Sequence, residues 1–446
     1  MTDNKIHFSG KYLAGLIIPL VISTMLANAV GIMDTLMLSS LGEESVSGVS
    51  MVDQINVLVL NIFAALATGG AVVTSQFLGA NRGDMANKSA KQLIFSGLMI
   101  STVVAVAAVL LNGTIIDLCF PSIDEKTRSA AVTYFYITAL SFPFMAIDNC
   151  CAALFRSFGK SNYCMYSSFI CNIVNIGGNA LAIYVLGWGV AGAALSTLVG
   201  RFVSMLLLLI WISGKRSPVR IKLFERFVPD LSMIKRILHI GIPSGMENSV
   251  FQLGRLLVVG IISEYGLVQT TANAVANTLD SFGCIFGHSM NLAVITIIGQ
   301  CVGAKDFDGV KRYAKKLFLI EYTFGSVFYL VTLIFIDPIL SWYNLSADTA
   351  ELTKLLVFIH NGVGMLIWPL AFTLPNFLRA ANDVKFPMTV SIISMLVCRL
   401  LLSYVLHYTL GLGAIGVWIG MVVDWIFRLS FFCVRFFKGS WKKYCE

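Results

Sequence analysis

Residues 76–92 read QFLGANRGDMANKSAKQ, and residues 300–316 read QCVGAKDFDGVKRYAKK. The two segments share Gln, Gly and Ala at matching places, and an offset of 224 residues relates them. The same offset relates paired positions along most of the chain: Pro19 and Pro243, Gly42 and Gly266, Gln76 and Gln300, Gly79 and Gly303, Ala80 and Ala304, Gly187 and Gly411, Gly189 and Gly413, Gly192 and Gly416. One offset that holds over this distance indicates two copies of one structural unit.

The segments around these motifs are apolar enough to cross a membrane. Of the 446 residues, 57% are hydrophobic and 13% are charged, whereas soluble domains carry about a quarter charged residues. The mean hydropathy is +0.81. Because about 20 consecutive apolar residues span a bilayer, we predict twelve spans: 12–40, 51–80, 89–112, 128–157, 163–187, 190–213, 233–264, 269–303, 312–337, 350–378, 387–409 and 413–437.

Each copy contains six of these spans. Since six is even, both copies share one orientation and the repeat is parallel. We therefore predict an all-α polytopic membrane protein with 12 transmembrane helices in two pseudo-symmetric six-helix bundles. The predicted parts are an N-lobe at 1–214, a cytoplasmic linker at 215–232 and a C-lobe at 233–446. Two such bundles suit transport by alternating access.

The net charge of +8 follows the topology instead of indicating a nucleic-acid partner. If the N-terminus is cytoplasmic, the predicted inner segments hold most of the Lys and Arg residues, seven of them within 215–236. The outer segments hold only Lys126, Arg128 and Lys354. Cytoplasmic loops of membrane proteins are enriched in Lys and Arg. We expect a multi-pass protein of a bacterial plasma membrane, with both termini cytoplasmic.

Ionisable side chains at bilayer depth cost at least about 2.5–3.5 kcal/mol each and are usually paired or functional. The candidates within the predicted spans are Asp34, Asp148, Arg201, Glu247, Arg255, Asp280, His288, Glu321, His360, Arg399, His407, Asp424 and Arg428. Asp34 has no basic residue one turn away on its own helix. We therefore expect partners from other helices, or a bound cation or proton.

The predicted fifth helix supplies amides in the stretch CNIVNIGGN. Asn172, Asn175 and Asn179 are three and four residues apart, so they share one helix face. A carboxylate near amide oxygens suits Na⁺ or a proton. The alternative is an amide clamp between helices.

Two further polar stripes lie on the predicted seventh and eighth helices. Ser244, Asn248, Gln252 and Arg255 follow one helix face, with Glu247 beside them. The second stripe contains Gln269, Asn273, Asn277, Asp280, Cys284, His288 and Asn291. The two stripes indicate the lining of a substrate cavity, with Glu247, Asn248, Gln252, Arg255, Asn273, Asn277 and Asp280 as its candidates. The alternative is that Glu247 and Arg255 are neutralised in structural ion pairs, with Asp280 as one partner.

The motifs of energy-converting and hydrolytic enzymes are missing from the sequence. It contains no Walker lysine motif and no Ser/His/Asp arrangement. The ten cysteines lack a CxxC pair and Cys/His metal spacing. We expect no enzymatic activity and no cofactor, so that energy comes from an ion gradient or from a partner ATPase.

The order of motifs resembles the MATE (multidrug and toxic compound extrusion) family of the MOP flippase superfamily. The resemblance covers nearly the whole chain. It rests on an early proline followed by Asp34, and then on SQFLGA at 75–80, FRSFGKSN at 155–162, NIVNIGGN at 172–179, WGVAGAALST at 188–197, IGIPSGMEN at 240–248 and GQCVGA at 299–304. It implies a V-shaped pair of lobes that exports organic cations or drugs in exchange for Na⁺ or H⁺.

The resemblance also implies a cation site in the N-lobe, at Asp34, Asn149, Asn175, Asn179 and Thr197. Some family members have an aspartate at the position of Asn179, so the site here has one negative charge fewer. Na⁺ would bind at Asp34, Asn175 and Asn179. Other branches use a glutamate in helix seven, for which Glu247 is a stand-in, and an aspartate in helix ten, which this sequence lacks. Asn376 is the polar residue nearest to that position.

The leading hypothesis is a cation-coupled antiporter, monomeric in the lipid bilayer, with small organic cations as substrates and no nucleic-acid partner. The alternatives are a lipid-linked oligosaccharide flippase of the same superfamily and a membrane scaffold or receptor without transport. Arg201, Arg255 and Arg399 favour the flippase, whereas the count of twelve spans opposes it. The repeat is symmetric in its glycines but not in its charges, because Asp34 aligns with Val258 and Asn175 aligns with Arg399.

Overall fold

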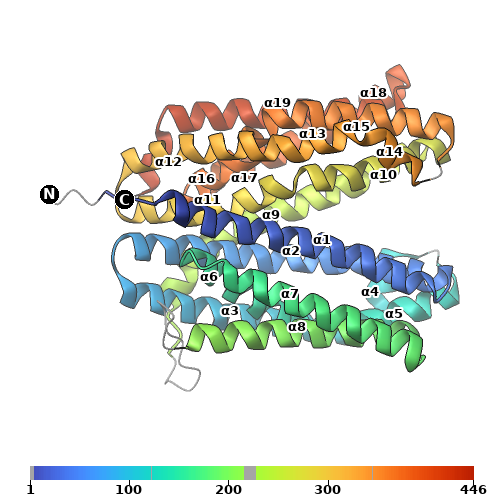
Figure 1. The fold of residues 1–446 in the computed structure, drawn as a ribbon, viewed down its shortest axis with the longest axis horizontal. Helices are drawn as coiled ribbons and strands as arrows, with labels where there is room; N and C mark the ends of the chain where they lie inside the picture. The colour runs from blue at the N-terminus through green and yellow to red at the C-terminus, as the bar shows by residue number, and fades with distance from the viewer. Residues whose placement is uncertain (1–4, 122, 215–227, 344, 446) are drawn as a thin grey trace. The chain divides into compact units, whose positions relative to one another are not determined.

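The computed structural model describes residues 5–121, 123–214, 228–343 and 345–445. These residues form helices and turns, without any strand. The helices of the first copy are α1 (Gly10–Ser39), α2 (Glu43–Gly79), α3 (Gly83–Leu110) with α4 (Asn112–Cys119), α5 (Glu125–Leu140) with α6 (Phe142–Ser157), α7 (Asn162–Asn179) with the π-helix η1 (Ala180–Val185), and α8 (Gly189–Ser213) (Figure 1).

The helices of the second copy follow the same order. They are α9 (Leu231–Ser263), α10 (Leu267–Gly283) with α11 (Ile285–Gly303), α12 (Phe307–Ile320) with η2 (Glu321–Gly325), α13 (Ser326–Ile334) and α14 (Ile336–Ser341), α15 (Ala347–Trp368) with η3 (Pro369–Thr373) and α16 (Leu374–Ala380), α17 (Lys385–Ser394) with η4 (Met395–Leu401) and α18 (Leu402–Leu410), and α19 (Gly413–Phe437). A 3₁₀-helix, η5 (Ser440–Tyr444), follows. The elements η2, η3 and η4 are π-helices.

Ten helices in the described residues are each long and apolar enough to cross a membrane, and the bent pair α5 and α6 would make an eleventh. With the 33-residue α9, the second copy also has six helical groups, as the first copy does. The predicted continuous span at 128–157 is broken, because α5 ends before Ser141 and α6 starts with Pro143 in its first turn, at an angle of 49°. Proline lacks the backbone N–H that a continuous helix needs and is tolerated in a first turn.

The duplication extends to unusual backbone angles. Four pairs of residues at the offset of 224 have positive φ: Gly42 (97°) and Gly266 (84°), Asn81 (56°) and Lys305 (58°), Gly187 (65°) and Gly411 (62°), Gly189 (55°) and Gly413 (56°). The turn after α2 is closed by a 2.9 Å bond from Arg82 N to Phe77 O, and the turn after α11 by a 2.9 Å bond from Asp306 N to Cys301 O. Both copies therefore use the same turn, although Asn81 and Lys305 differ in chemistry.

The chain packs as two compact units, Phe8–Gly245 and Met1–His7 with Met246–Glu446. We call them the N-terminal and the C-terminal unit. The boundary between them falls within the sequence of α9, and the beginning of this helix belongs to the N-terminal unit. It packs there against α2: a Cβ added to Gly241 would lie 3.3 Å from Ala65 O. The lobe limits at 214 and 233, which describe the sequence repeat, stay a prediction. Most of the predicted linker, residues 215–227, lies outside the described residues.

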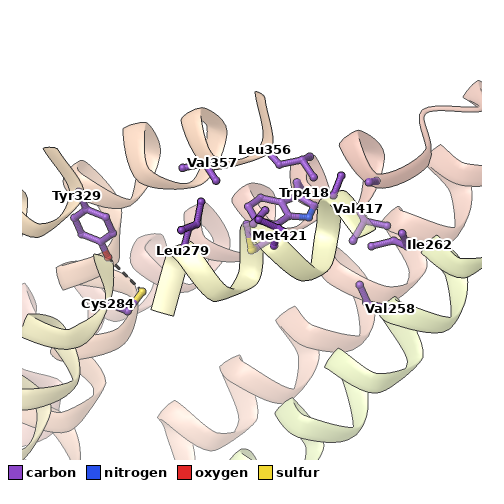
Figure 2. Packing of buried hydrophobic residues seen from close by; sticks show 14 of the residues in the cluster. Val258, Ile262, Leu279, Cys284, Tyr329, Leu356, Val357, Val417, Trp418 and Met421 are labelled. Carbon is purple, nitrogen blue, oxygen red and sulfur yellow. Dashed lines mark hydrogen bonds between the residues drawn. The ribbon is translucent and has the colours of Figure 1, made fainter. Parts of the chain in front are cut away.

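Each unit has its own apolar core. In the N-terminal unit, Phe142 lies 6.4 Å from both Phe63 and Phe135, measured between ring centroids. Figure 2 shows part of the C-terminal core, where Leu279 of α10 faces Val357 of α15 and Trp418 of α19. At its edge, Tyr329 Oη lies 3.5 Å from Cys284 Sγ. The polar groups described below lie in helices that these cores hold in place.

Candidate functional site

Asp34 on α1 faces the end of α7. Asn179 Nδ2 donates to Asp34 Oδ1 across 2.7 Å. The same amide lies 3.5 Å from Asn175 Oδ1, and Asn175 Nδ2 donates to Thr197 Oγ1 on α8 across 3.2 Å. Four of the five residues predicted for the N-lobe cation site thus form one hydrogen-bonded chain across three helices.

Close helix packing brings Asn175 to Thr197. A Cβ added to Gly178 would lie 2.8 Å from Ser196 Oγ, and one added to Gly192 would lie 2.7 Å from Ala182 Cβ. At Gly200 the distance to Cys171 O would be 3.3 Å. These three glycines let α7, with its π-helical continuation, approach α8 at the depth of the asparagines. The stretch NIGGN and the glycines of α8 are therefore a packing motif that also positions amides.

Asn172 has a different role from the other two asparagines. Its Nδ2 donates to the backbone carbonyl of Leu26 on α1 across 3.1 Å. A second link between the same helices is the 2.9 Å bond between Ser23 and Ser168 hydroxyls. The amide clamp considered for the asparagines applies to Asn172, which holds α1 against α7 below Asp34.

The fifth predicted residue, Asn149, does not join the chain of hydrogen bonds. Its Nδ2 donates to Met145 O on its own helix across 2.8 Å. Its neighbour Asp148 accepts from Ser204 Oγ across 2.5 Å. The structure therefore gathers Asp34, Asn175, Asn179 and Thr197, and places Asn149 on α6 with a local partner.

Two residues near this hydrogen-bonded chain were not among those predicted from the sequence. Asp53 on α2 interacts electrostatically with Asp34, and it accepts from Asn56 Nδ2 at 3.3 Å. The buried hydroxyl of Tyr134 on α5 faces both Asp53 and Thr197. Asp53 and Asn56 are three residues apart within the predicted span 51–80, and this spacing was a signal for a second polar face.

The negative charge of Asp34 has no close basic side chain to offset it among the described residues, so the site is suited to a cation. No Lys or Arg nitrogen in the described residues lies within 4.0 Å of the Asp34 carboxylate. Arg201 interacts with it electrostatically, but Arg201 Nη1 donates to Ser141 Oγ across 2.7 Å. Asn179 is 1% exposed, and its Oδ1 has no hydrogen-bond partner among the described residues. A carboxylate beside an unpaired amide oxygen is a fitting pair of ligands for a monovalent cation or a proton.

Among the residues predicted to line the substrate cavity, Glu247 has a basic partner, unlike Asp34 within the described part of the chain. Glu247 of α9 forms an ion pair with Arg379 of α16 at 2.5 Å, and Arg379 also donates to Asn376 Oδ1 at 2.6 Å. Asn248 and Gln252 lie half-buried on α9. The basic partner of Glu247 is therefore Arg379, which was not among the residues predicted for the cavity, and it is not Arg255.

The amides on α10 connect helices. Asn277 Nδ2 donates to Asn273 O at 2.8 Å and to Asn273 Oδ1 at 3.1 Å. Asn273 Oδ1 also accepts from Trp418 Nε1 of α19 across 3.0 Å. Asn273 is 5% exposed, so this pair fixes α10 to α19 inside the C-terminal unit.

Asp280, also on α10, lies 3.2 Å from His360 Nδ1. It interacts electrostatically with Arg255 and Arg399 as well. The His360 ring packs edge-on against Trp425 at 4.9 Å. Asp280 and His360 thus form a buried pair, and Arg255 reaches Asp280 only through a longer-range electrostatic interaction.

A further buried charge is neutralised around Asp424, which is fully buried on α19. Arg428 Nε donates to Asp424 Oδ1 across 2.8 Å, and Arg399 Nη1 lies 4.0 Å from Oδ2. Ser394 Oγ also donates to this carboxylate. Arginines thus offset the charges of Glu247 and Asp424, whereas no arginine or lysine of the described residues lies within 4.0 Å of Asp34.

Comparison with known proteins places this arrangement in a family. The MatE family model matches residues 19–181 and 243–405. Both ends of the second match lie 224 residues after those of the first. The chain belongs to the MatE family. Its resemblance to MATE transporters is thereby confirmed, and the family match repeats with the offset found in the sequence.

Relatives of this MatE protein cover almost its whole length. An uncharacterized transporter, YisQ of Bacillus subtilis, is 29% identical over 92% of this chain and 90% of its own length. A probable multidrug resistance protein NorM of Thermotoga maritima is 26% identical over 97% and 93%. This MatE chain is therefore a transporter.

Solved structures show the fold. A crystal structure of MATE in the bent conformation has a TM-score of 0.86 and 20% identity, covering 98% of this chain and 96% of that one. A MOP superfamily transporter from Pyrococcus furiosus has a TM-score of 0.87 and 20% identity, covering 97% and 96%. The prediction of an all-α MATE-like fold with twelve membrane helices is confirmed.

Proposed function

We propose that this MatE chain is a cation-coupled antiporter that exports organic cations or drugs, with Asp34 as the coupling residue. The observation that carries the proposal is the contact between Asp34 and Asn179 at 2.7 Å, with Asn179 Oδ1 left unpaired. The NorM relative, a probable multidrug resistance protein, supports the export of small molecules.

The chemistry at Asp34 suits either coupling ion. With the carboxylate ionised, the Asn179 amide donates to it. A proton on Asp34 would find an acceptor in the unpaired Oδ1 of the same amide. Na⁺ would find the carboxylate and the oxygens of Asn175 and Asn179. We propose H⁺ or Na⁺ as the coupling ion and no other cofactor.

Cation binding would act on α1, which connects the site to the rest of the N-terminal unit. Pro19 lies inside α1, fifteen residues before Asp34. A proline inside a helix removes one backbone hydrogen bond and permits a bend. Neutralising Asp34 weakens its charge-assisted bond with Asn179 and so changes how α1 is held against α7. This change would bias alternating access, because a bound ion shifts a conformational equilibrium through its differential affinity.

The decisive experiment is substrate flux in vesicles that contain the purified chain, with Na⁺ and pH gradients imposed separately. The wild type should export an organic cation under one of the two gradients, and D34N should lose this flux while it remains folded. The matched control is D337N, because Asp337 is exposed and paired with Lys354 at 2.7 Å. Normal gradient-driven flux by D34N would overturn the proposal.

We also propose that the chain lies as a monomer in a bacterial plasma membrane with both termini in the cytoplasm. The excess of Lys and Arg in the predicted inner segments supports this orientation. The bacterial relatives support the source. Reporter fusions at the C-terminus, active only on one side of the membrane, test the orientation.

A further inference from the structure

Glu321 lies at a break in helical register. It is the first residue of the π-helix η2, and Thr373 is the last residue of the π-helix η3. Both π-helices pack against α11, which carries Asn291. π-Helical turns are rare in proteins overall, and those that occur are often found at functional sites.

These three residues form a compact polar group in the C-terminal unit. Thr373 Oγ1 lies 2.7 Å from Glu321 Oε1 and 2.9 Å from Asn291 Oδ1. Glu321 is 2% exposed and Thr373 is fully buried. The second carboxylate oxygen of Glu321, Oε2, is buried and has no hydrogen-bond partner among the described residues.

In the part of the chain that the structure describes, no base neutralises this carboxyl group. Within the described residues, no Lys, Arg or His nitrogen lies within 4.0 Å of Glu321. The groups that interact with it electrostatically are the phenols of Tyr322 and Tyr329, which carry no charge to offset an anion. Glu247 and Asp424, by contrast, each have an arginine at their carboxylate. An isolated buried carboxylate is far more costly than a paired one.

The other ionisable groups on the elements around η2 are engaged elsewhere or exposed. Tyr322 donates to Leu366 O across 2.9 Å. The other groups include Tyr329 beside Cys284, His360 beside Asp280, His288 against the Trp368 ring, and the exposed Lys315 and Lys316 of α12. The remaining surroundings are apolar and include Phe286, which lies 6.1 Å from Phe324.

This polar group has one hydrogen too few for the hydrogen bonds between its oxygens. The Thr373 hydroxyl has a single hydrogen but two close acceptors, Glu321 Oε1 and Asn291 Oδ1. If Glu321 is ionised, one of the two oxygen pairs has no hydrogen between its members. One added proton completes the group: Glu321 donates to Thr373 Oγ1, and Thr373 donates to Asn291.

The other copy of the repeat has no counterpart of this group. At the offset of 224 residues, Glu321 corresponds to Gly97, Asn291 to Ala67 and Thr373 to Asn149. A Cβ added to Gly97 would lie 2.8 Å from Cys150 Sγ, so the N-terminal unit has no room for a side chain there. The carboxyl group is thus a feature of the C-terminal unit alone and is not dictated by the shared fold.

We propose that Glu321, Thr373 and Asn291 form a proton-binding site in the C-terminal unit, with Glu321 as the group that takes up and releases the proton. The site is separate from Asp34 and goes beyond the proposed coupling there. It gives the transporter a second carboxyl group whose protonation state can differ between conformations.

The test is infrared difference spectroscopy of the full-length purified chain between acidic and alkaline buffer. We expect a carbonyl band of a protonated carboxyl group in the wild type that disappears at alkaline pH. E321Q should lose this band and remain folded, since a neutral amide resembles the protonated acid. T373V should keep the band but displace it, because the hydrogen-bond partner of the carboxyl group is gone.

Two controls separate this site from the others. The second control residue is the exposed Glu264, whose carboxylate accepts from Tyr408 Oη across 3.0 Å. D34N and E264Q should both retain the band, and so failure of the coupling proposal at Asp34 would not remove it. If E321Q does not fold, E321D replaces it and should shift the band instead of removing it. A band unchanged in E321Q, or one removed by added Na⁺ at constant pH in place of a pH change, would overturn the proposal.

Discussion

Asn179 contacts Asp34 through the nitrogen of its side-chain amide and not through the amide oxygen. Its Nδ2 donates to Asp34 Oδ1 at 2.7 Å, and its Oδ1 is buried without a hydrogen-bond partner among the described residues. A buried acceptor of this kind costs free energy until a ligand or proton satisfies it. The relationship between these two residues therefore fits a site that is completed by a cation.

Replacing Asn179 by Ala should weaken coupling without unfolding the protein. Hydrogen bonds to charged groups contribute about 1.5–3 kcal/mol, and about 1.4 kcal/mol is a tenfold change, so we expect a roughly ten- to hundredfold loss in apparent affinity for the coupling ion. The measurement is flux against ion concentration in vesicles. N172A is the matched control, because Asn172 bonds to the Leu26 backbone and should affect stability more than ion dependence.

The sequence alone indicated much of this site, because its signals are local. Asn175 and Asn179 are one helical turn apart, and the motif order linked them to Asp34 and Thr197. Asp53 and Tyr134 were missed because they come from α2 and α5. One sequence does not show which faces of separate helices meet.

The partners of Glu247 and Glu321 show a second limit. The predicted span 350–378 ends one residue before Arg379, yet α16 continues to Ala380 and Arg379 pairs with Glu247. Thr373 meets Glu321 through two π-helical turns. A π-turn shifts the register by one residue, and a search for a period of 3.6 residues does not detect it.

Two adjacent glycines on α7 should respond in opposite ways to alanine. A Cβ at Gly178 would lie 2.8 Å from Ser196 Oγ, whereas a Cβ at Gly177 has nothing within 4 Å. Overpacking costs about 1–3 kcal/mol, so G178A should lower the thermal unfolding temperature and reduce transport. G177A should raise the unfolding temperature slightly, since alanine favours a helix over glycine by about 0.5–1 kcal/mol. Equal behaviour of the two variants would contradict the close packing of α7 and α8.

The exposed pair of Asp117 and Arg128 should give a measurable pH dependence. Hydrogen bonds from the Arg128 guanidinium, at 2.6 and 2.9 Å, lower the pKa of Asp117 from its usual value of 3.8. A lowered pKa in the folded state means that this stabilisation is complete above the unfolded-state pKa and is lost as the pH falls through the folded-state pKa. The difference in unfolding temperature between wild type and D117N should therefore be constant near neutral pH and vanish in strong acid. In an R128Q background, the same comparison should show no such loss.

The ion pair between Glu247 and Arg379 should prove structural in a double-mutant cycle. Removing one partner of a buried pair costs about 3–5 kcal/mol, because the other charge is left without compensation. E247M and R379M should therefore each lower the unfolding temperature strongly, as should E247Q, whereas E247M/R379M should recover most of the loss because neither charge remains. D337N, which breaks the exposed pair with Lys354, is the control and should cost under about 1 kcal/mol. If E247Q were as stable as the wild type but abolished ion-dependent flux, Glu247 would be a coupling residue like the one expected in other MATE branches, and the C-terminal unit would share the task of Asp34.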